Sequence, residues 1–245
     1  ENLGICRDAL LEAVAETSEE FMERYFNGDE FSEDEIRQAL RVNVIDGSIV
    51  PVLMGSNILA RGMYTLMADI VKYFPSPDKR ECAGINTKTN EVYQADYNFA
   101  KPKSAYIFKT IVDPYIGKYS LIKVNSGVLK TDDVLYNYHR DCDEKIGRLY
   151  VLKGNKVEEV SELHAGDIGA LAKLAKSLTT DSLSTRNNPV AYLRANISKP
   201  YVSMRYKAKN KGDEDKISQS LQKMLMEDLT LRNVNDAENH QTLLY

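Results

Sequence analysis

The residues that could bind phosphate occur in this sequence, but not at the spacing that nucleotide chemistry requires. A phosphate-binding loop, GxxxxGK[ST], needs a glycine five residues before its Gly-Lys pair. Gly117-Lys118 is the one Gly-Lys pair, and Val112 occupies the place of that glycine. DxxG, which would position magnesium and a γ-phosphate, is absent, and the NKxD-like stretch at 155–158 ends in Glu158. The chain should therefore not hydrolyse a nucleotide by itself.

The cysteines and histidines, which could act as nucleophiles or metal ligands, are scattered along the sequence. The three cysteines (Cys6, Cys82 and Cys142) and the three histidines (His139, His164 and His240) form no CxxC, HExxH or paired Cys/His spacing. We expect no metal site and no disulfide framework, and an odd number of widely spaced cysteines favours a reducing compartment. Ser/His/Asp and Cys/His arrangements are missing too, so these residues predict no complete catalytic site.

Composition and charge place the chain among ordinary globular proteins with an uneven distribution of charge. It has 245 residues, 43% of them hydrophobic and 28% charged. Residues 1–100 hold 9 basic and 18 acidic side chains, a net charge of −9, whereas residues 101–181 carry +2 and residues 182–245 carry +3. No apolar run reaches the ~18 residues of a membrane span. Because the first residue is Glu1, we expect the chain to be cut from a longer protein.

The first quarter of the chain predicts helices and one buried strand. Apolar residues recur at helical spacing from Ile5 to Val14, and Thr17 and Ser32 each precede a glutamate by three residues, the pattern of a capping box. The apolar run 49–54 predicts a buried strand that ends in Gly55-Ser56-Asn57, and a helix follows Gly62. A strand, a loop and a helix in succession are typical of one unit of a larger α/β sheet.

Two further patterns follow along the chain. Residues 103–184 hold short β-rich segments separated by turn signals, which predict a small barrel of at least six strands. From residue 200 the order is a strand, a helix starting near Asp213 and two strands joined by a polar hairpin, the first two thirds of a split βαβ unit. Its apolar face should lack part of its cover; the side chains concerned are Ile197, Val202, Met204, Leu231, Val234, Leu243 and Leu244.

Several motifs in these segments resemble one family, the elongation factor G family of translation GTPases. The second domain of that family is similar to the DPYIGK stretch at 113–118, VNSGVL at 124–129, GRL at 147–149 and AGDIGA at 165–170. YFPSP at 73–77 looks like the junction after the GTP-binding domain, and 207–218, Glu227-Asp228 and Gln241-Thr242 are similar to the third domain. The sequence at 169–174 and 213–216 is more similar to the elongation factor G-like paralogue.

The resemblance implies a multidomain α/β plus β fold. Residues 1–77 would be the C-terminal part of a P-loop GTPase domain, 78–102 a linker, 103–190 a translation-factor-type β-barrel, and 191–245 a truncated ferredoxin-like third domain. Gly55, Ser56 and Asn57 match the loop whose backbone reads guanine, although Asn57 replaces the usual Ala. The second domain rests on ribosomal RNA in the family, so the resemblance makes basic residues of the barrel candidate phosphate contacts: Lys118, Lys123, Lys130, Arg148 and Lys153.

Two departures from the family pattern bear on the fold. Thr-Gly-Asp-Thr becomes Thr179-Thr180-Asp181-Ser182, so we expect a turn that needs a positive φ to be rebuilt there. Glu-Asp-Pro becomes Glu227-Asp228-Leu229, which removes a fixed φ at the end of the third-domain helix. Both changes suit a divergent paralogue.

The resemblance also implies a function for the full-length protein. It would be a cytoplasmic, ribosome-associated GTPase that couples its nucleotide state to translocation, with ribosomal RNA and small-subunit proteins as partners and neither DNA nor membrane. GTP or GDP with magnesium would bind only that full-length protein, and this chain should carry no cofactor. Two alternatives stay open: a ribosome-protection or release-factor-type GTPase, and a stand-alone RNA- or protein-binding module.

Overall fold

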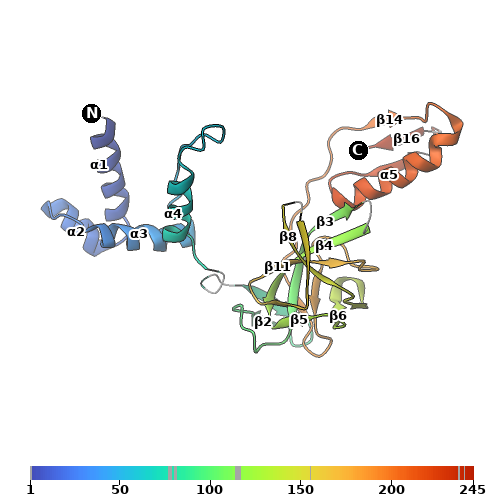
Figure 1. Cartoon of the computed structure of the whole chain (residues 1–245), viewed down its shortest axis with the longest axis horizontal. Helices are drawn as coiled ribbons and strands as arrows, with labels where there is room; N and C mark the ends of the chain where they lie inside the picture. Colours follow the sequence, from blue (N-terminus) through green and yellow to red (C-terminus); the bar gives the residue numbers. More distant parts are fainter. Residues whose placement is uncertain are drawn as a thin grey trace. The chain divides into compact units, whose positions relative to one another are not determined.

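The computed structural model describes residues 2–76, 79, 82–113, 117–154, 156–236, 238–239 and 241–245. The chain divides into two compact units, Glu1–Arg80 and Glu81–Tyr245. Figure 1 shows that helices make up the first unit, whereas strands dominate the second. This mixed architecture confirms the predicted multidomain α/β plus β fold class.

The first unit contains four helices whose ends are set by local capping. They are α1 (Asn2–Ala15), α2 (Glu19–Asn27), α3 (Glu33–Asp46) and α4 (Met63–Tyr73). Ser32 and Glu35 form the predicted capping box of α3, and Gly28 ends α2 in the left-handed conformation. The cap of α2 is Ser18 and not the predicted Thr17, whose hydroxyl instead donates to the carbonyl of Val14 at 2.6 Å.

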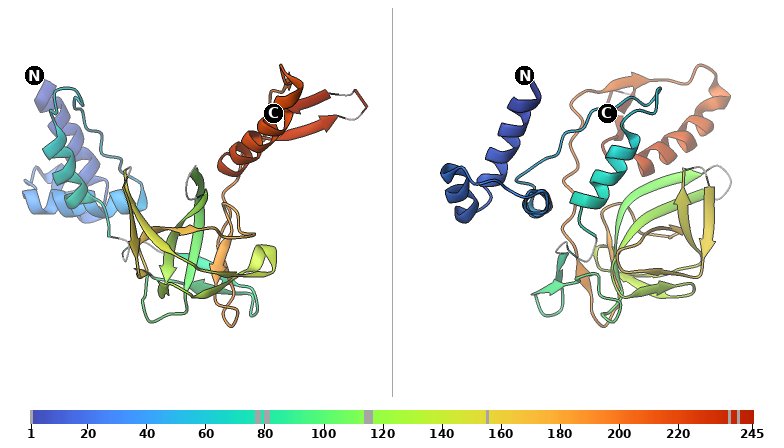
Figure 2. Two further views of the ribbon diagram at one scale, coloured as in Figure 1. Left: turned by 45° about the vertical axis from the view of Figure 1, so that its right-hand side comes forward. Right: turned by 60° about the vertical axis from the view of Figure 1, so that its left-hand side comes forward.

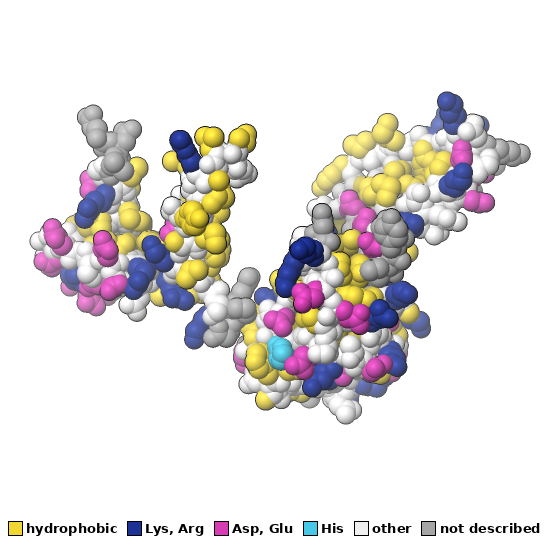
Figure 3. Space-filling model, viewed as in Figure 1, with side chains coloured by type: hydrophobic (Ala, Val, Ile, Leu, Met, Phe, Trp, Pro, Cys, Tyr) yellow, Lys and Arg dark blue, Asp and Glu magenta, His cyan; other side chains and the backbone are white. Residues whose placement is uncertain are grey.

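The strand predicted at 49–54 is wrong. This segment has no regular structure, and Val50, Val52 and Met54 are 75%, 87% and 94% exposed. A strand needs a neighbouring strand to satisfy its amides and carbonyls, and the described part of the first unit supplies none. Figure 3 shows hydrophobic side chains gathered along α4, beside this segment in the sequence. The helix after Gly62 is as predicted, but its strand is not formed.

A barrel makes up most of the second unit. Its main sheet has eight strands in the order β7-β6-β12-β3-β4-β11-β8-β9, and every pairing is antiparallel. These strands, in chain order, are β3 (Ser104–Asp113), β4 (Gly117–Ser126), β6 (Val134–Asn137), β7 (Cys142–Lys145), β8 (Leu149–Lys153), β9 (Lys156–Val160), β11 (Ile168–Ala172) and β12 (Ser182–Ser184). A short sheet pairs β5 (Val128–Lys130) with β10 (Glu162–His164). The prediction of at least six strands is confirmed.

The strands curl into a barrel (Figure 2). The largest hydrophobic cluster among the described residues lies inside it. Ile107, Ile122, Leu135 and Leu183 lie inside it with no exposed surface. Alternation explains this placement, because residues two apart on β4, such as Ile122 and Val124, face inward together. The short 3-10 helix η2 (Tyr138–Arg140) joins β6 to β7.

The segment predicted as a linker, 78–102, contains a hairpin. Strands β1 (Ala83–Asn86) and β2 (Glu91–Gln94) pair with each other, and β1 also pairs with β13 (Val190–Ala191). Gly84 lies against β13 so closely that a Cβ there would meet a Val190 methyl at 2.7 Å. The chain entering the barrel is therefore tied to the chain leaving it.

The third domain contains the predicted β-α-β-β order. It consists of β14 (Met204–Tyr206), the 3-10 turn η3 (Lys211–Asp213), α5 (Glu214–Glu227), β15 (Asn233–Asp236) and β16 (Gln241–Leu244). The sheet order β14-β16-β15, with both pairings antiparallel, is that of a split βαβ unit. Ile197, Val202, Met204 and Val234 are among its exposed large hydrophobic side chains, whereas Leu231, Leu243 and Leu244 are half-buried.

The core placement predicts a large difference between two isoleucines on neighbouring strands. Ile122→Ala should lower the free energy of unfolding by about 2–5 kcal/mol, because it leaves a cavity in the barrel. Ile168→Ala, on the adjacent strand β11 and 59% exposed, should cost well under ~1 kcal/mol. Urea denaturation followed by circular dichroism measures both. Equal losses would mean that β4 does not present Ile122 to the core.

Candidate functional site

The loop at 54–62 is a tight turn that closes on itself. The amide of Ser56 donates to the carbonyl of Arg61 and the amide of Arg61 donates back, both at 3.1 Å. Gly55 is required, since a Cβ there would lie 2.8 Å from the Arg61 oxygen, and Gly62 has a φ of +80°. The predicted guanine-reading residues Gly55, Ser56 and Asn57 thus lie in one hydrogen-bonded turn.

Only part of this turn is available to a ligand. The Ser56 amide is already bonded, and the Ser56 hydroxyl accepts from the amide of Leu59 at 3.3 Å. Asn57 is exposed, and among the described residues its amide has no hydrogen-bond acceptor. One backbone donor can read a carbonyl oxygen, but it cannot hold a nucleotide without further contacts.

Lys118 is held inside the barrel wall. Its ammonium donates to the carbonyl of Ser177 at 2.8 Å, and the side chain is half-buried. Burial lowers the pKa of Lys118, while the nearby carboxylates of Glu144 and Asp181 act in the opposite direction. This lysine is placed to fix a loop of the barrel.

Arg148 and Lys153 lie on or beside the hairpin formed by β8 and β9. Arg148 forms an ion pair with Glu159 at 3.4 Å, and Lys153 forms one with Glu158 at 3.0 Å. All four side chains are more than half exposed, so water screens these pairs and a phosphate could replace either carboxylate. The hairpin thus presents alternating charges and not a basic patch.

Lys123 and Lys130 lie nearer to the entrance of the chain into the barrel. The Lys123 ammonium is 4.8 Å from the centre of the Tyr97 ring, a cation–π contact. Lys130 pairs with Glu162 across β5 and β10 at 3.4 Å. The five predicted basic residues therefore form no single basic patch, and each has a partner.

Two buried carboxylates, whose bonds to backbone amides no sequence motif predicts, organise the loop between β11 and β12. Glu144 is 4% exposed and accepts hydrogen bonds from the amides of Ala175, Lys176 and Ser177 at 2.9, 2.7 and 2.7 Å. Burial opposes ionisation of Glu144, but the hydrogen bonds outweigh it and hold the pKa of this carboxyl below its ordinary value. One carboxylate thus replaces the strand partner that three successive amides lack.

A second carboxylate lies beside it. Asp181 is fully buried and accepts from Asn137 at 3.0 Å, from Arg140 at 3.0 Å and from the amide of Leu178 at 3.0 Å. Arg194 reaches the other oxygen of Asp181 at 3.4 Å. Burial acts to raise the pKa of Asp181, yet these donors and the charge of Arg140 leave it lowered. The network connects the barrel to the segment that leads out of it.

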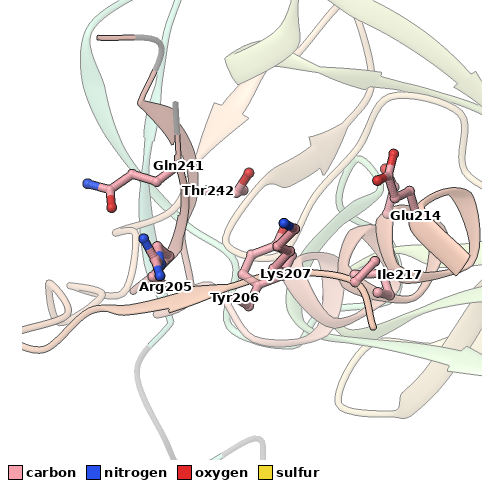
Figure 4. Close-up of a pocket in the computed structure, with 9 residues that line it drawn as sticks. Arg205, Tyr206, Lys207, Glu214, Ile217, Gln241 and Thr242 are labelled. Carbon is pink, nitrogen blue, oxygen red and sulfur yellow. The ribbon is translucent and has the colours of Figure 1, made fainter. Parts of the chain in front are cut away.

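The third domain has a polar pocket of about 500 Å³ between its sheet and α5 (Figure 4). Figure 4 shows Lys207 and Thr242 on the strand side, with Ile217 and Glu214 projecting from α5. Its lining is completed by Arg205, Tyr206, Ala208, Ser218 and Gln241. Cations and a carboxylate share the pocket, so its residues do not select one ligand charge.

The described residues also bear on metal binding, on the cysteines and on membrane insertion. In the described ranges, no group of three or more His, Cys, Asp or Glu side chains could hold a metal ion. Cys6 is exposed, Cys82 half-buried and Cys142 buried. No described helix has the length and apolarity that a membrane span needs.

Comparison with known proteins assigns the barrel and the third domain. Residues 102–186 match the family model of elongation factor G domain 2, and residues 197–245 match that of elongation factor G domain III. The two ranges together make up more than half of the chain. The chain belongs to the elongation factor G family. The crystal structure of ttk003000868 from Thermus thermophilus is similar over 98% of this chain, with a TM-score of 0.73 and 27% sequence identity. This chain spans 34% of that structure's length.

Against the elongation factor G pattern, the turn at 179–182 keeps a left-handed residue despite its different sequence. Thr180 replaces the glycine and adopts a φ of +75°, so the expectation that this turn is rebuilt is wrong. Its amide donates to the carbonyl of Ile107 at 2.7 Å, and its hydroxyl accepts from Arg194 at 3.1 Å. Tertiary hydrogen bonds thus hold a β-branched residue in a conformation that favours glycine.

The lost proline is also compensated locally. In this elongation factor G fragment α5 ends at Glu227, and the Asp228 carboxylate accepts from the amide and the hydroxyl of Thr230 at 2.9 and 2.6 Å. This turn fixes the chain where proline would fix φ. Glu227 accepts from the amide of Val112 at 2.6 Å and so attaches α5 to β3.

The positive φ of Thr180 should reverse the usual order of stability between an alanine and a glycine substitution. Thr180→Gly should be about 1 kcal/mol more stable than Thr180→Ala, because both lose the hydroxyl but only alanine keeps the left-handed strain. At Thr179, where φ is negative, alanine should be the more stable of the same pair. Chemical denaturation of the four variants decides this. If the alanine variant were the more stable at both positions, Thr180 would not be strained by its positive φ.

Glu144 makes the barrel sensitive to acid. Its lowered pKa means that its stabilisation is fully present above the ordinary pKa of 4.5 and is lost as the pH falls toward the lowered value. Glu144→Gln should cost about 1.5–3 kcal/mol at pH 7, since it removes the charge from several hydrogen bonds. Below the ordinary pKa of 4.5 this difference should shrink.

Thermal unfolding between neutral and strongly acidic pH measures this effect. Glu158→Gln, at an exposed ion pair, serves as the control and should leave the pH profile unchanged. If the difference in thermal stability between Glu144→Gln and the protein without this substitution stays constant with pH, the result contradicts an ionised Glu144.

Proposed function

We propose that this chain is a fragment of a ribosome-associated translation elongation factor of the elongation factor G type. The observation that carries the proposal is the succession of matches to domain 2 and domain III of that family on a barrel and a split βαβ unit. The match to domain III supports the elongation-factor branch over the two alternatives raised by the sequence. In the full-length protein these domains would transmit the nucleotide state to the ribosome, in the cytoplasm.

Nucleotide chemistry belongs to the longer protein in this proposal. GTP and magnesium would bind where a phosphate-binding loop, DxxG and NKxD are present, and this sequence has none of them. The turn at 54–62 would contribute the Asn57 amide to guanine recognition in that setting. Assignment to the elongation factor G-like paralogue is part of the proposal and is supported by Thr180 and Leu229, which depart from the main pattern.

The geometry of the second unit suggests how its domains act together. Arg194 is bonded to Asp181 and Thr180 of the barrel, and the Ala195 amide donates to the hydroxyl of Tyr106 at 3.2 Å. The connection to the third domain is therefore fixed to the barrel up to residue 195. Motion of the third domain would begin beyond that point, with Glu227 as a second attachment.

Ribosome binding that does not depend on nucleotide is the test of this function. The chain should co-sediment with purified ribosomes at low salt, and added GTP should not change the bound fraction, because the phosphate-binding motifs are missing. Binding should weaken as salt rises, as for any contact with RNA phosphates. Absence of sedimentation at low salt, or a response to GTP, would contradict the proposal.

A further inference from the structure

Two residues fix the chain where it leaves the barrel for the third domain. The Arg194 side chain donates to Thr180 at 3.1 Å and to Asp181 at 3.4 Å, and the Ala195 amide donates to a tyrosine hydroxyl of β3 at 3.2 Å. We call these contacts of Arg194 and Ala195 the anchor. Residues 196–202 follow, and in the described part of the chain they form no backbone hydrogen bond. The anchor therefore sets the point at which this unbonded segment begins.

The contact with Arg194 is the longest of those that Asp181 makes. One oxygen of this carboxylate accepts from Asn137, from Arg140 and from the Leu178 amide, each at 3.0 Å. The other oxygen accepts from Arg194 at 3.4 Å. Asp181 is fully buried, whereas the Arg194 side chain is 47% exposed, so water solvates the guanidinium when this contact opens. Arg194 is therefore the donor that Asp181 loses most readily.

A histidine lies close to the anchor. His139 belongs to η2, which packs against β12 and β13. Its ring is half-buried, and the Nε2 atom is buried with no hydrogen-bond partner in the described ranges. A neutral ring buries only an unpaired acceptor there, whereas a ring with both protons would bury a charged donor, which costs far more. The surroundings of His139 therefore suit the neutral ring.

The charges that face His139 act in the same direction as its burial. Burial and then the charge of Arg194 lower the pKa of His139 from its ordinary value of 6.5, Arg140 adds to this, and Asp181 opposes it. The strands β12 and β13 themselves contain no titratable side chain. A form of the chain in which the anchor opens and the ring meets water therefore binds a proton more readily than the closed form.

We propose that His139 is an acid-sensitive control of the anchor, so that protonation of its ring releases the chain leading to the third domain. The added cation repels the two arginines and competes for Asp181, and Arg194, the most distant donor, leaves. Ala195 then loses its position beside β3, and the unbonded segment extends back toward β13. The proposal concerns the conformation of this chain and does not rest on the proposed function.

Hydrogen exchange of the Ala195 amide, corrected for the intrinsic effect of pH, tests the proposal. From about pH 8 down to the ordinary histidine pKa of 6.5 its protection should stay constant. Below 6.5 the protection should fall by about tenfold per pH unit, because opening of the anchor then takes up one proton. In His139→Gln the protection should not change with pH in this range, since glutamine takes up no proton.

His164→Gln is the matched control. This second histidine lies on β10 with its side chain 42% exposed, and its ion-pair partners Glu162 and Asp167 do not belong to the anchor. Its substitution should leave the pH profile of the Ala195 amide as it is in the unchanged protein. The proposal is overturned if His139→Gln shows the same acid response as the unchanged protein, or if the unchanged protein shows none.

A second amide distinguishes release of the anchor from unfolding of the barrel. The Val124 amide donates to the carbonyl of Asp167 at 3.0 Å, inside the barrel. Its protection should stay constant over the range in which that of Ala195 falls, because only the anchor opens. A parallel fall at both amides would mean that the whole barrel opens in acid, against the proposal. The titration of Glu144 lies below 4.5 and so outside this range.

Removal of the guanidinium tests the other half of the proposal at constant pH. Arg194→Gln should lower the protection of the Ala195 amide about tenfold near neutral pH, because a hydrogen-bonded charge pair is lost. The same variant should show little further loss below 6.5, since the contact that acid opens is already gone. If Ala195 keeps its full protection in Arg194→Gln, or loses it in acid as steeply as the unchanged protein does, Arg194 is not the group that His139 displaces and the proposal fails.

Discussion

The second unit depends on two ionised carboxylates that lie inside its wall. Residues 175–178, in the loop between β11 and β12, do not pair with a strand, so their amides need other acceptors. Glu144 serves three of them, and Asp181 serves a fourth together with Asn137 and Arg140. An apolar side chain of the same size would leave buried donors unsatisfied, which costs about 1–3 kcal/mol for each group. The conformation of residues 175–178 follows from this constraint.

The elements that the sequence predicted well are those fixed by local chemistry. The capping box at Ser32, the glycine end of α2, the strands of the barrel and the β-α-β-β order all appear in the structure. Their signals lie within a few residues of each other, so no distant contact is needed to read them. The motif resemblance to elongation factor G was specific for the same reason, since it rested on short turn motifs in a fixed order.

The predictions that failed concern segments whose conformation depends on residues far away in the sequence. The run 49–54 has the composition of a buried strand, but a strand exists only beside another strand. Thr180 was expected to change the turn, yet Ile107 and Arg194, far away in the sequence, hold it. The partners of charged side chains cannot be read from the sequence either. Lys118 has the pattern of a surface cation but bonds to Ser177, and the pairing of Lys153 with Glu158 depends on a hairpin register.

Where the chain leaves the barrel, buried polar side chains again accept hydrogen bonds from backbone amides. The hydroxyls of Ser184 and Ser182 accept from the amides of Val190 and Tyr192 at 3.0 and 2.9 Å. Side chains of β12 thus replace a strand partner for these two amides, and Arg194 continues this attachment through Asp181. Since Asp181 also orders the loop before β12, one carboxylate joins the interior of the barrel to the base of the third domain. A disturbance of that loop must therefore reach the connection between the two domains.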